Sequence, residues 1–259
     1  MIPRILVIAG SDSSAGAGIQ ADLKTAMAFG VYAQTAVTAV TAQDTEGVHV
    51  LHVMPAGLVR AQIEAALNDI GADAIKIGML GNGSIARVVA DVLDGIDLPI
   101  VLDPVLMSSS DAALLDEGGL AVLKSRLIPL ANLITPNLPE AEALTGILPR
   151  SNHTMRNSAQ AFAIMGARQI LFKGGHGQGD IVRDVLVSTS GEFTFEAPRQ
   201  DTPHTHGTGC TLSTAITCGL AAGLEMREAV GQAHAYVQQA IAAAPGLGEG
   251  SGPLGHRSN

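Results

Sequence analysis

Short apolar segments alternate with helix-like segments along most of this 259-residue chain, and no other feature restricts its fold as strongly. Buried strands are predicted over six apolar runs, each bounded by Gly, Pro or Asp, at residues 5–9, 74–80, 100–106, 133–135, 170–172 and 185–187. Helical patterns occupy residues 19–29, 56–68, 84–93, 119–127, 154–165, 212–222 and 229–243. Alternating strands and helices form parallel sheets with right-handed crossovers. The pattern therefore predicts an α/β fold with a mostly parallel central sheet and helices on both faces.

Residues 31–53 depart from this alternation because they are rich in Val, Thr and Ala and contain a turn-like segment at 43–47. We predict extended structure there, which could pair across a dimer. No internal repeat or long linker divides the chain, and the Gly-rich segment 245–253 is its only low-complexity stretch. We therefore expect a single domain over residues 1–259.

Composition and charge exclude several classes of function. The net charge of −9 argues against a nucleic-acid partner, which requires a basic surface. No apolar run approaches the roughly 18 residues that a membrane span requires. Cys210 and Cys218 are too few for a disulfide framework, and eight positions on one helix would separate them by about 12 Å. Reduced thiols, together with an N-terminus that lacks a signal-peptide pattern, predict a cytoplasmic protein.

The loop after the first strand, residues 9–22 (AGSDSSAGAGIQAD), is a candidate ligand-binding segment. Its small residues would let a ligand approach the backbone, and Asp22, one turn into the next helix, could face that ligand. The alternative is an ordinary flexible loop. Residues 16–21 also fit the pattern G-x-G-x-x-A, which leaves a dinucleotide-binding oxidoreductase as an alternative of another class. That match is weak, because about six residues separate the first Gly from the strand end.

A second candidate lies at residues 205–213 (THGTGCTLS), immediately before a helical pattern. The sequence Gly207-Thr208-Gly209 would leave unpaired N–H groups at a helix N-terminus, where they could bind a transferring phosphoryl group. Cys210 would lie in the same positive field, which favours the thiolate. The alternative is a buried structural cysteine. The nearby pair His204 and His206 is interpreted as two loop residues, because no further Cys or His completes a zinc site.

Acidic, amide and basic side chains follow three other predicted strands. Asp103 ends one strand, and Asn137 and Glu140 are three residues apart at a helix start. Oxygen ligands of this kind suit Mg²⁺, although each residue alone is more often a helix cap or a solvated side chain. Lys173 ends another strand and could neutralise nucleotide phosphate. Met79 lies at a strand end and could line a pocket. The sequence contains no P-loop pattern, G-x-x-x-x-G-K-[ST].

Together and in this order, these segments resemble the hydroxymethylpyrimidine/phosphomethylpyrimidine kinase family of the ribokinase-like superfamily. The motifs that carry the resemblance extend over nearly the whole chain: AGSDSSAGAGIQADLKT (9–25), TAQDTEGV (41–48), KIGML (76–80), DPV (103–105), TPNLPEAE (135–142), KGGH (173–176), DVLV (184–187), HGTGCTLS (206–213) and GEGSGPLGH (248–256). Most ribokinase-like enzymes have Asp at the end of the Gly-Thr-Gly motif, and Cys210 there resembles the pyrimidine-kinase branch.

The resemblance implies an ATP-dependent kinase that phosphorylates a hydroxymethylpyrimidine and then its monophosphate, for thiamin synthesis. By the same resemblance, five residues would surround the pyrimidine: Gly10, Asp22, Gln43, Met79 and Val105, with Gln43 bonded to the ring. The remaining roles concern phosphate and metal. Gly207, Thr208 and Gly209 would bind the transferring phosphoryl group, Cys210 would lie where the hydroxyl is activated, Lys173 would contact ATP phosphate, and Asp103, Asn137 and Glu140 would organise Mg²⁺.

One segment departs from the family pattern. After Asp103-Pro104-Val105 the family usually has Lys-Ser-Gly, whereas this chain has MSSSD at residues 107–111. The loss of that cation bears on the second phosphorylation, in which the substrate is a charged monophosphate. A pyridoxal-type vitamin kinase is the alternative with the same chemistry. We expect a homodimer whose ligands are a small-molecule pyrimidine and ATP.

Overall fold

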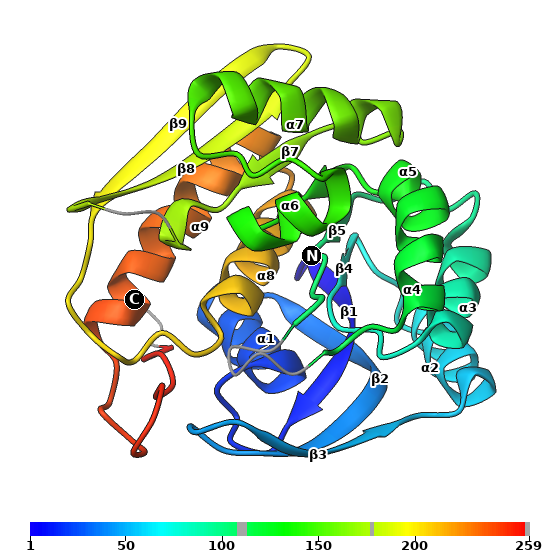
Figure 1. Ribbon diagram of the computed structural model, residues 1–259. Helices are drawn as coiled ribbons and strands as arrows, with labels where there is room; N and C mark the ends of the chain where they lie inside the picture. Colours follow the sequence, from blue (N-terminus) through cyan, green and yellow to red (C-terminus); the bar gives the residue numbers. More distant parts are fainter. Residues whose placement is uncertain (108–112, 177–178, 257–259) are drawn as a thin grey trace.

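The computed structural model describes residues 1–107, 113–176 and 179–256. Over these residues the chain forms a nine-stranded sheet with the order β3-β2-β1-β4-β5-β6-β7-β8-β9 (Figure 1). Every neighbouring pair from β2 to β7 is parallel, and β3, β8 and β9 pair antiparallel with their neighbours at the two ends of the sheet. The mostly parallel α/β fold predicted from the sequence is confirmed.

The strand bounds show where prediction succeeded. The strands are β1 (Arg4–Asp12), β2 (Tyr32–Gln43), β3 (Val48–Val53), β4 (Ala74–Ile77), β5 (Ile100–Leu102), β6 (Leu133–Ile134), β7 (Ile170–Phe172), β8 (Ile181–Ser188) and β9 (Gly191–Pro198). The segment 31–53 is the hairpin of β2 and β3, with its turn at residues 44–47. The prediction missed β9, because this edge strand has no buried residue and therefore no apolar run.

Helices cover both faces of the sheet, as expected (Figure 1). One face is covered by α2 (Ala56–Asn68), α3 (Gly83–Leu93), α4 (Glu117–Val122), η1 (Leu123–Leu127), α5 (Ile128–Leu130), α6 (Leu138–Thr145) and α7 (Asn152–Ile164). The other face is covered by α1 (Gly18–Ala28), α8 (Thr208–Ala221) and α9 (Met226–Ala242). Alternate residues of β1 divide between the two cores: Leu6 and Ile8 pack on the first face, and Ile5 and Val7 on the second. This period of two is what a strand buried on both faces requires.

The candidate segments meet at one edge of the sheet because the central strands are parallel. The loops that follow β1, β4, β5, β6 and β7 all leave the sheet at its carboxyl edge, where the N-terminus of α8 also lies. The predicted strands at 74–80 and 100–106 are too long. They end at Ile77 and Leu102, and the residues that follow them form loops at this edge. Among the described residues, no helix is both long and apolar enough to cross a membrane.

Candidate active site

A cavity of about 1280 Å³ lies at the carboxyl edge of the sheet. Twelve of the thirteen site residues predicted from the sequence lie on its wall: Gly10, Gln43, Met79, Asp103, Val105, Asn137, Glu140, Lys173, Gly207, Thr208, Gly209 and Cys210. They come from segments as far apart in sequence as β1 and α8. The parallel topology therefore brings nearly the whole predicted set to one place.

The N-terminus of α8 presents unpaired backbone amides to this cavity. Gly207 is the N-cap in the left-handed region, with a φ of 82°, and its carbonyl accepts the first helical hydrogen bond, from the N–H of Thr211 at 2.9 Å. No side chain among the described residues caps this helix end. The amides of Gly209 and Cys210 precede Thr211 and so have no acceptor within the helix. Free amides at a helix N-terminus can bind an anion, as the sequence predicted for a phosphoryl group here.

A partly buried cation and two buried carboxylates lie beside these amides. The Lys173 Nζ is 2.7 Å from Asp103 Oδ1 and 3.7 Å from Glu140 Oε2, and the Thr135 hydroxyl also donates to Asp103, at 3.0 Å. A β-carbon at Gly209 would lie 3.3 Å from the Lys173 Nζ and 3.5 Å from Asp103 Oδ2. The helix terminus, the lysine and the carboxylate therefore converge on one part of the cavity wall.

The charges in this cluster perturb one another. Burial by itself would lower the pKa of Lys173, but the charges of Asp103 and Glu140 raise it above the ordinary value. The lysine is therefore charged. Burial raises the pKa of Glu140 to about 7, with Lys173 opposing the shift and Asp103 adding to it.

Asn137 and Glu140 form a capping box at the start of α6. The Glu140 N–H donates to the Asn137 side-chain oxygen at 2.8 Å, and the Asn137 N–H donates to Glu140 Oε2 at 2.7 Å. The Asn137 amide oxygen thus caps the helix with one lone pair, and its predicted part in organising Mg²⁺ stays a prediction. Among the described residues, no three acidic, His or Cys side chains form a metal cluster. Asp103 and Glu140 fit Mg²⁺ better through water than as direct ligands.

Asp22 does not line the cavity, contrary to the expectation that it faces a ligand. Its side chain is fully buried and accepts from the Lys76 ammonium at 2.9 Å and from the Thr214 hydroxyl at 2.6 Å. Burial by itself would lower the pKa of Lys76, but the charge of Asp22 raises it. The sequence analysis gave Lys76 no role. A β-carbon at Gly78 would lie 2.8 Å from the Lys76 Nζ, so glycine at position 78 leaves room for the lysine side chain. The pair supports the cavity floor from β4, α1 and α8.

The structure corrects the expected ionisation of Cys210. The side chain is on the cavity wall in the first turn of α8, but burial raises its pKa to about 11, and Asp22 and Asp103 add to the rise. Lys76 and a hydrogen bond from the Gly18 N–H oppose the shift without cancelling it. The thiol is therefore neutral at neutral pH. Desolvation outweighs the helix field that predicted a thiolate.

An apolar slot adjoins the cavity and contributes Met79, Val105 and Leu114 to its wall. It is a cluster of four residues, separate from the two cores: Ala39, Met79, Val105 and Leu114. A β-carbon at Gly10 would lie 2.9 Å from the Met79 sulfur, so glycine at position 10 makes room for this side chain. Gln43 adds an amide to the same cavity. A flat heterocycle with one polar edge fits such a slot.

Comparison with known proteins identifies the family of this chain. A family model described as phosphomethylpyrimidine kinase matches residues 12–255. The chain belongs to this family. The hydroxymethylpyrimidine/phosphomethylpyrimidine kinase of Haemophilus influenzae is 45% identical, with 98% of this chain and 97% of that protein covered. The protein of the same name from Streptomyces coelicolor is 46% identical, with 98% and 94% covered.

Relatives with further names point to the same group of enzymes. The "Thiamine biosynthesis bifunctional protein ThiED" of Geobacter sulfurreducens is 44% identical over 97% of this chain and 52% of its own length. Among solved structures, the phosphomethylpyrimidine kinase of Clostridium difficile has a TM-score of 0.81 at 39% identity, covering 93% of this chain and all of that one. The pyridoxal kinase of Staphylococcus aureus in complex with AMP-PCP and pyridoxal has a TM-score of 0.90 at 33% identity, covering 100% and 95%. The ribokinase-like fold expected from the resemblance is confirmed.

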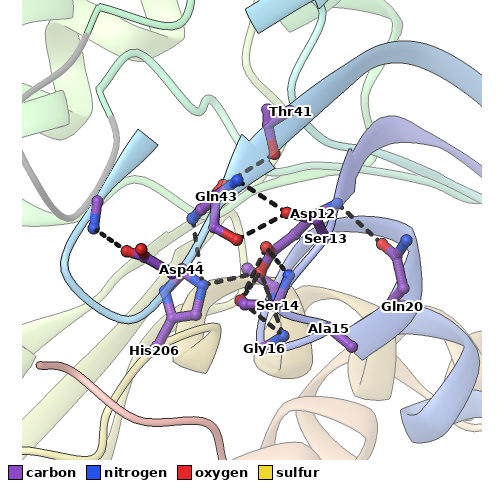
Figure 2. Close-up of polar contacts among 12 residues, drawn as sticks. Asp12, Ser13, Ser14, Ala15, Gly16, Gln20, Thr41, Gln43, Asp44 and His206 are labelled. Atoms are coloured by element: carbon purple, nitrogen blue, oxygen red, sulfur yellow. Dashed lines mark hydrogen bonds and ion pairs between the residues drawn. The ribbon is translucent and has the colours of Figure 1, made fainter. Parts of the chain in front are cut away.

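Besides Lys76, two residues at the site were given no role by the sequence analysis. His206, interpreted as a loop residue, is only 6% exposed, and its Nε2 lies 2.9 Å from Asp12 Oδ2 (Figure 2). Its position directly before Gly207 was the signal that could have identified it. Asp12 lies in the small-residue loop that was singled out, but no role was assigned to it. The substituted segment 107–111 lies outside the described residues except for Met107, which lines the cavity.

Proposed function

We propose that this chain transfers the γ-phosphoryl group of ATP to 4-amino-5-hydroxymethyl-2-methylpyrimidine, and then to the monophosphate, in thiamin synthesis. The observation that carries the proposal is the juxtaposition of two features in a chain of this family. The open N-terminus of α8 beside Lys173 and Asp103 suits a transferring phosphoryl group, and the slot of Met79 and Val105 suits the pyrimidine ring. ADP and AMP-PCP bound to the related pyridoxal kinases support ATP as the phosphate donor.

The residues would act mainly by positioning and by charge stabilisation. The ring would lie against Met79 and Val105, with Gln43 bonded to its polar edge. The amides of Gly209 and Cys210 would stabilise the negative charge that develops on the transferring group, and charged Lys173 would add to that field. Because the Cys210 thiol is neutral, we assign it to the positioning of the substrate hydroxyl rather than to general-base catalysis.

Asp103 and Glu140 would hold Mg²⁺ through water, with Lys173 balancing their charge when the metal is absent. When bound, the ion would offset the charge of the ATP phosphates. Because two buried carboxylates lie next to one lysine, we expect the cluster to accept a hydrated cation together with the anionic nucleotide.

A pyridoxal-type vitamin kinase is the second candidate. Pyridoxal kinases of known structure superimpose on this chain with TM-scores of 0.90 to 0.91, against 0.81 for the phosphomethylpyrimidine kinase cited above. Sequence identity runs in the other direction, at 33–35% against 39%. The family membership favours the pyrimidine, and it also favours a kinase over the oxidoreductase suggested by residues 16–21.

The deciding experiment measures ADP formation from Mg-ATP with three separate acceptors: the hydroxymethylpyrimidine, its monophosphate and pyridoxal. We expect the pyrimidine to have the highest kcat/KM. A higher kcat/KM for pyridoxal would establish the second candidate, and no ADP formation with any acceptor would overturn the kinase assignment. Turnover with the alcohol but not with the monophosphate would show that the second phosphorylation is lost. That loss would point to segment 107–111, which lacks the cation usual in the family.

We also propose that residues 1–259 form one domain that works in the cytoplasm as a homodimer. The two free cysteines are consistent with a reducing compartment. The edge hairpin of β2 and β3 exposes Val40 and Val50 and would supply the contact between subunits. Sedimentation of the wild-type protein and of V50K would test the dimer, because a charge at the contact should release monomers.

A further inference from the structure

Asp184 is a buried acid on β8 to which the proposed function assigns no role. It opens the motif DVLV (184–187), and the residue is only 6% exposed. Side chains alternate along a strand, and the next residue on the same face, Leu186, lies in the apolar core with Leu171. An acid at such a position costs folding free energy unless its oxygens are bonded. A specific partner is therefore expected.

The partner of Asp184 is the backbone of the segment that carries Lys173. Its Oδ1 accepts from the Gly174 N–H at 2.8 Å. Its Oδ2 lies 3.9 Å from the His234 Nε2, beyond hydrogen-bond distance. Among the residues that the structure describes, the Gly174 N–H is therefore the only hydrogen-bond donor to this carboxyl group. Because a backbone N–H can only donate, the direction of the bond is fixed.

This bond lies just beyond the end of the ladder between β7 and β8. The two strands pair antiparallel as far as Phe172 and Val185 (Figure 1). Gly174 then approaches β8 so closely that a β-carbon at this position would collide with the Arg183 carbonyl. The Asp184 side chain therefore supplies an acceptor to an amide that the ladder no longer reaches.

The peptide groups on the two sides of the Lys173 α-carbon are held from opposite directions. The Lys173 N–H donates to the Pro136 carbonyl, after β6, at 2.9 Å, and the Gly174 N–H donates to Asp184 on β8. Strands β6 and β8 are the two neighbours of β7 in the sheet. From this fixed α-carbon the side chain extends into the cavity, where its Nζ lies 2.7 Å from Asp103 Oδ1.

The bond to Gly174 does not depend on the ionisation of Asp184. Burial raises the pKa of its carboxyl group, while the Gly174 N–H and the charges of His234 and Lys173 oppose the rise. A protonated carboxyl group keeps one oxygen that only accepts, and that oxygen can face the amide. The side-chain oxygen of an asparagine can accept in the same way, so Asp184→Asn is a conservative variant at this position.

We propose that Asp184 is a positioning residue for phosphoryl transfer: by holding the Gly174 amide, it fixes the backbone of Lys173 so that the ammonium group meets the ATP phosphates. The inference rests on the proposed function, in which Lys173 contacts phosphate. Asp184 acts through the backbone and makes no contact with the reacting atoms. A misplacement of about 1 Å can lower a rate roughly 100-fold, so one backbone hydrogen bond suffices for a measurable effect.

The test compares the steady-state kinetics of the wild type, D184L and D184N with Mg-ATP and the hydroxymethylpyrimidine. Leucine has the same branched skeleton as aspartate but no acceptor, so D184L should lower kcat/KM for ATP roughly 10- to 100-fold. The KM for the pyrimidine should change less than about threefold, because the slot of Met79 and Val105 is untouched. In D184N the side-chain oxygen can still accept from Gly174, and kcat/KM should stay within about threefold of wild type.

A double-mutant cycle with Lys173 separates positioning from general destabilisation. If Asp184 acts through the lysine, K173Q/D184L should have the same kcat/KM for ATP as K173Q alone, within about threefold. Multiplied effects in the double variant, an unchanged kcat/KM in D184L, or a value in D184N as low as in D184L would each overturn the inference. D184A removes the acceptor without adding volume, and it replaces D184L if the leucine variant does not fold.

Asp73 offers a matched control at the opposite edge of the sheet, immediately before β4. Its Oδ2 accepts from the Arg4 N–H at 2.8 Å, so D73L also removes the acceptor of a backbone amide. Because this amide is remote from the cavity, kcat/KM for ATP in D73L should stay within about threefold of wild type. A loss as large as in D184L would show that destabilisation alone lowers the rate, which would overturn the inference.

Hydrogen exchange in the wild type tests the bond itself. The Gly174 amide should be protected, and exchange at the rate of an unfolded peptide would overturn the inference. A wild type that forms no ADP would overturn the proposed function and this inference with it, whereas an active wild type with an equally active D184L would overturn the inference alone.

Discussion

At the scale of the residue, the site depends on buried charges that are matched in pairs. Lys76 faces Asp22, Lys173 faces Asp103, and His206 faces Asp12, each within 2.7 to 2.9 Å. In the two Lys–Asp pairs, removal of one member would leave the other charge buried and unpaired, at a cost of about 3–5 kcal/mol. Five of these six residues line the cavity, and Asp22 lies beneath it.

The raised pKa of Cys210 leads to a test of its reactivity. At a pKa of about 11, roughly one thiol in a thousand is ionised at pH 8, so iodoacetamide should modify Cys210 about 100-fold more slowly than free cysteine. The rate should rise with pH up to about 11. Peptide mass spectrometry would follow the labelling. C210S is the control and should remain unlabelled, because Cys218 is fully buried. Rapid labelling at pH 7 would contradict the neutral thiol.

At the scale of the element, the two ends of α8 differ in what their glycines do. Gly207 precedes the helix with a φ of 82° and packs against the Gly16 backbone, whereas Gly223 follows it with a φ of 86° and has no atom near its missing β-carbon. Both positions favour glycine conformationally. Only the first is also restricted by a neighbouring backbone.

This difference predicts unequal effects of the same substitution. G223A should cost about 1 kcal/mol of stability, from backbone strain alone, and leave kcat unchanged. G207A adds a collision that displaces the start of the helix, so we expect a larger loss of stability and a kcat reduced roughly 100-fold. Urea denaturation and ADP formation would measure the two effects. Equal kcat values in the two variants would show that the anion-binding amides tolerate displacement.

The elements also show which parts of the fold can be predicted from sequence. The runs at 5–9 and 170–172 were recognised because strands buried on both faces require continuous apolar residues. The helix α6 was not predicted as an element, because eight residues are too few for a clear helical period. Only its start was recognised, from Asn137 and Glu140. The sequence analysis left open whether Asn137 is a helix cap or a metal ligand, because both use the same side-chain oxygen, and the structure shows the cap.

At the scale of the whole molecule, the C-terminal segment ties together elements that are distant in sequence. The Gly255 N–H donates to Ala240 of α9, the Ser251 N–H donates to Thr45 of the hairpin turn, and the His256 Nε2 lies 2.9 Å from the Thr211 hydroxyl of α8. The Gly-rich composition of this tail allows its backbone to approach closely. A β-carbon at Gly250 or Gly255 would collide with a carbonyl group.

His256 predicts how stability depends on pH. Burial, and next the charge of Lys24, lower its pKa to about 4, against an ordinary value of 6.5. Between these two pH values the unfolded chain binds the extra proton, so the stabilisation is complete above about pH 6.5 and is lost as the pH falls toward 4. From pH 7.5 to 5, wild type should lose about 1 kcal/mol more than H256Q, allowing for partial exposure. Urea denaturation at both pH values would measure this difference, and equal losses would contradict the role of His256.

The sequence by itself determined the fold class, the family and most of the cavity wall. Strand and helix periodicities are local properties, and the site motifs lie at loop positions that parallel topology must bring together. Only the tertiary structure decided that Asp22 is buried beneath the cavity, that Cys210 is a neutral thiol, and that Asp12 meets His206. Those properties depend on desolvation and on contacts between distant segments, and no local pattern encodes either.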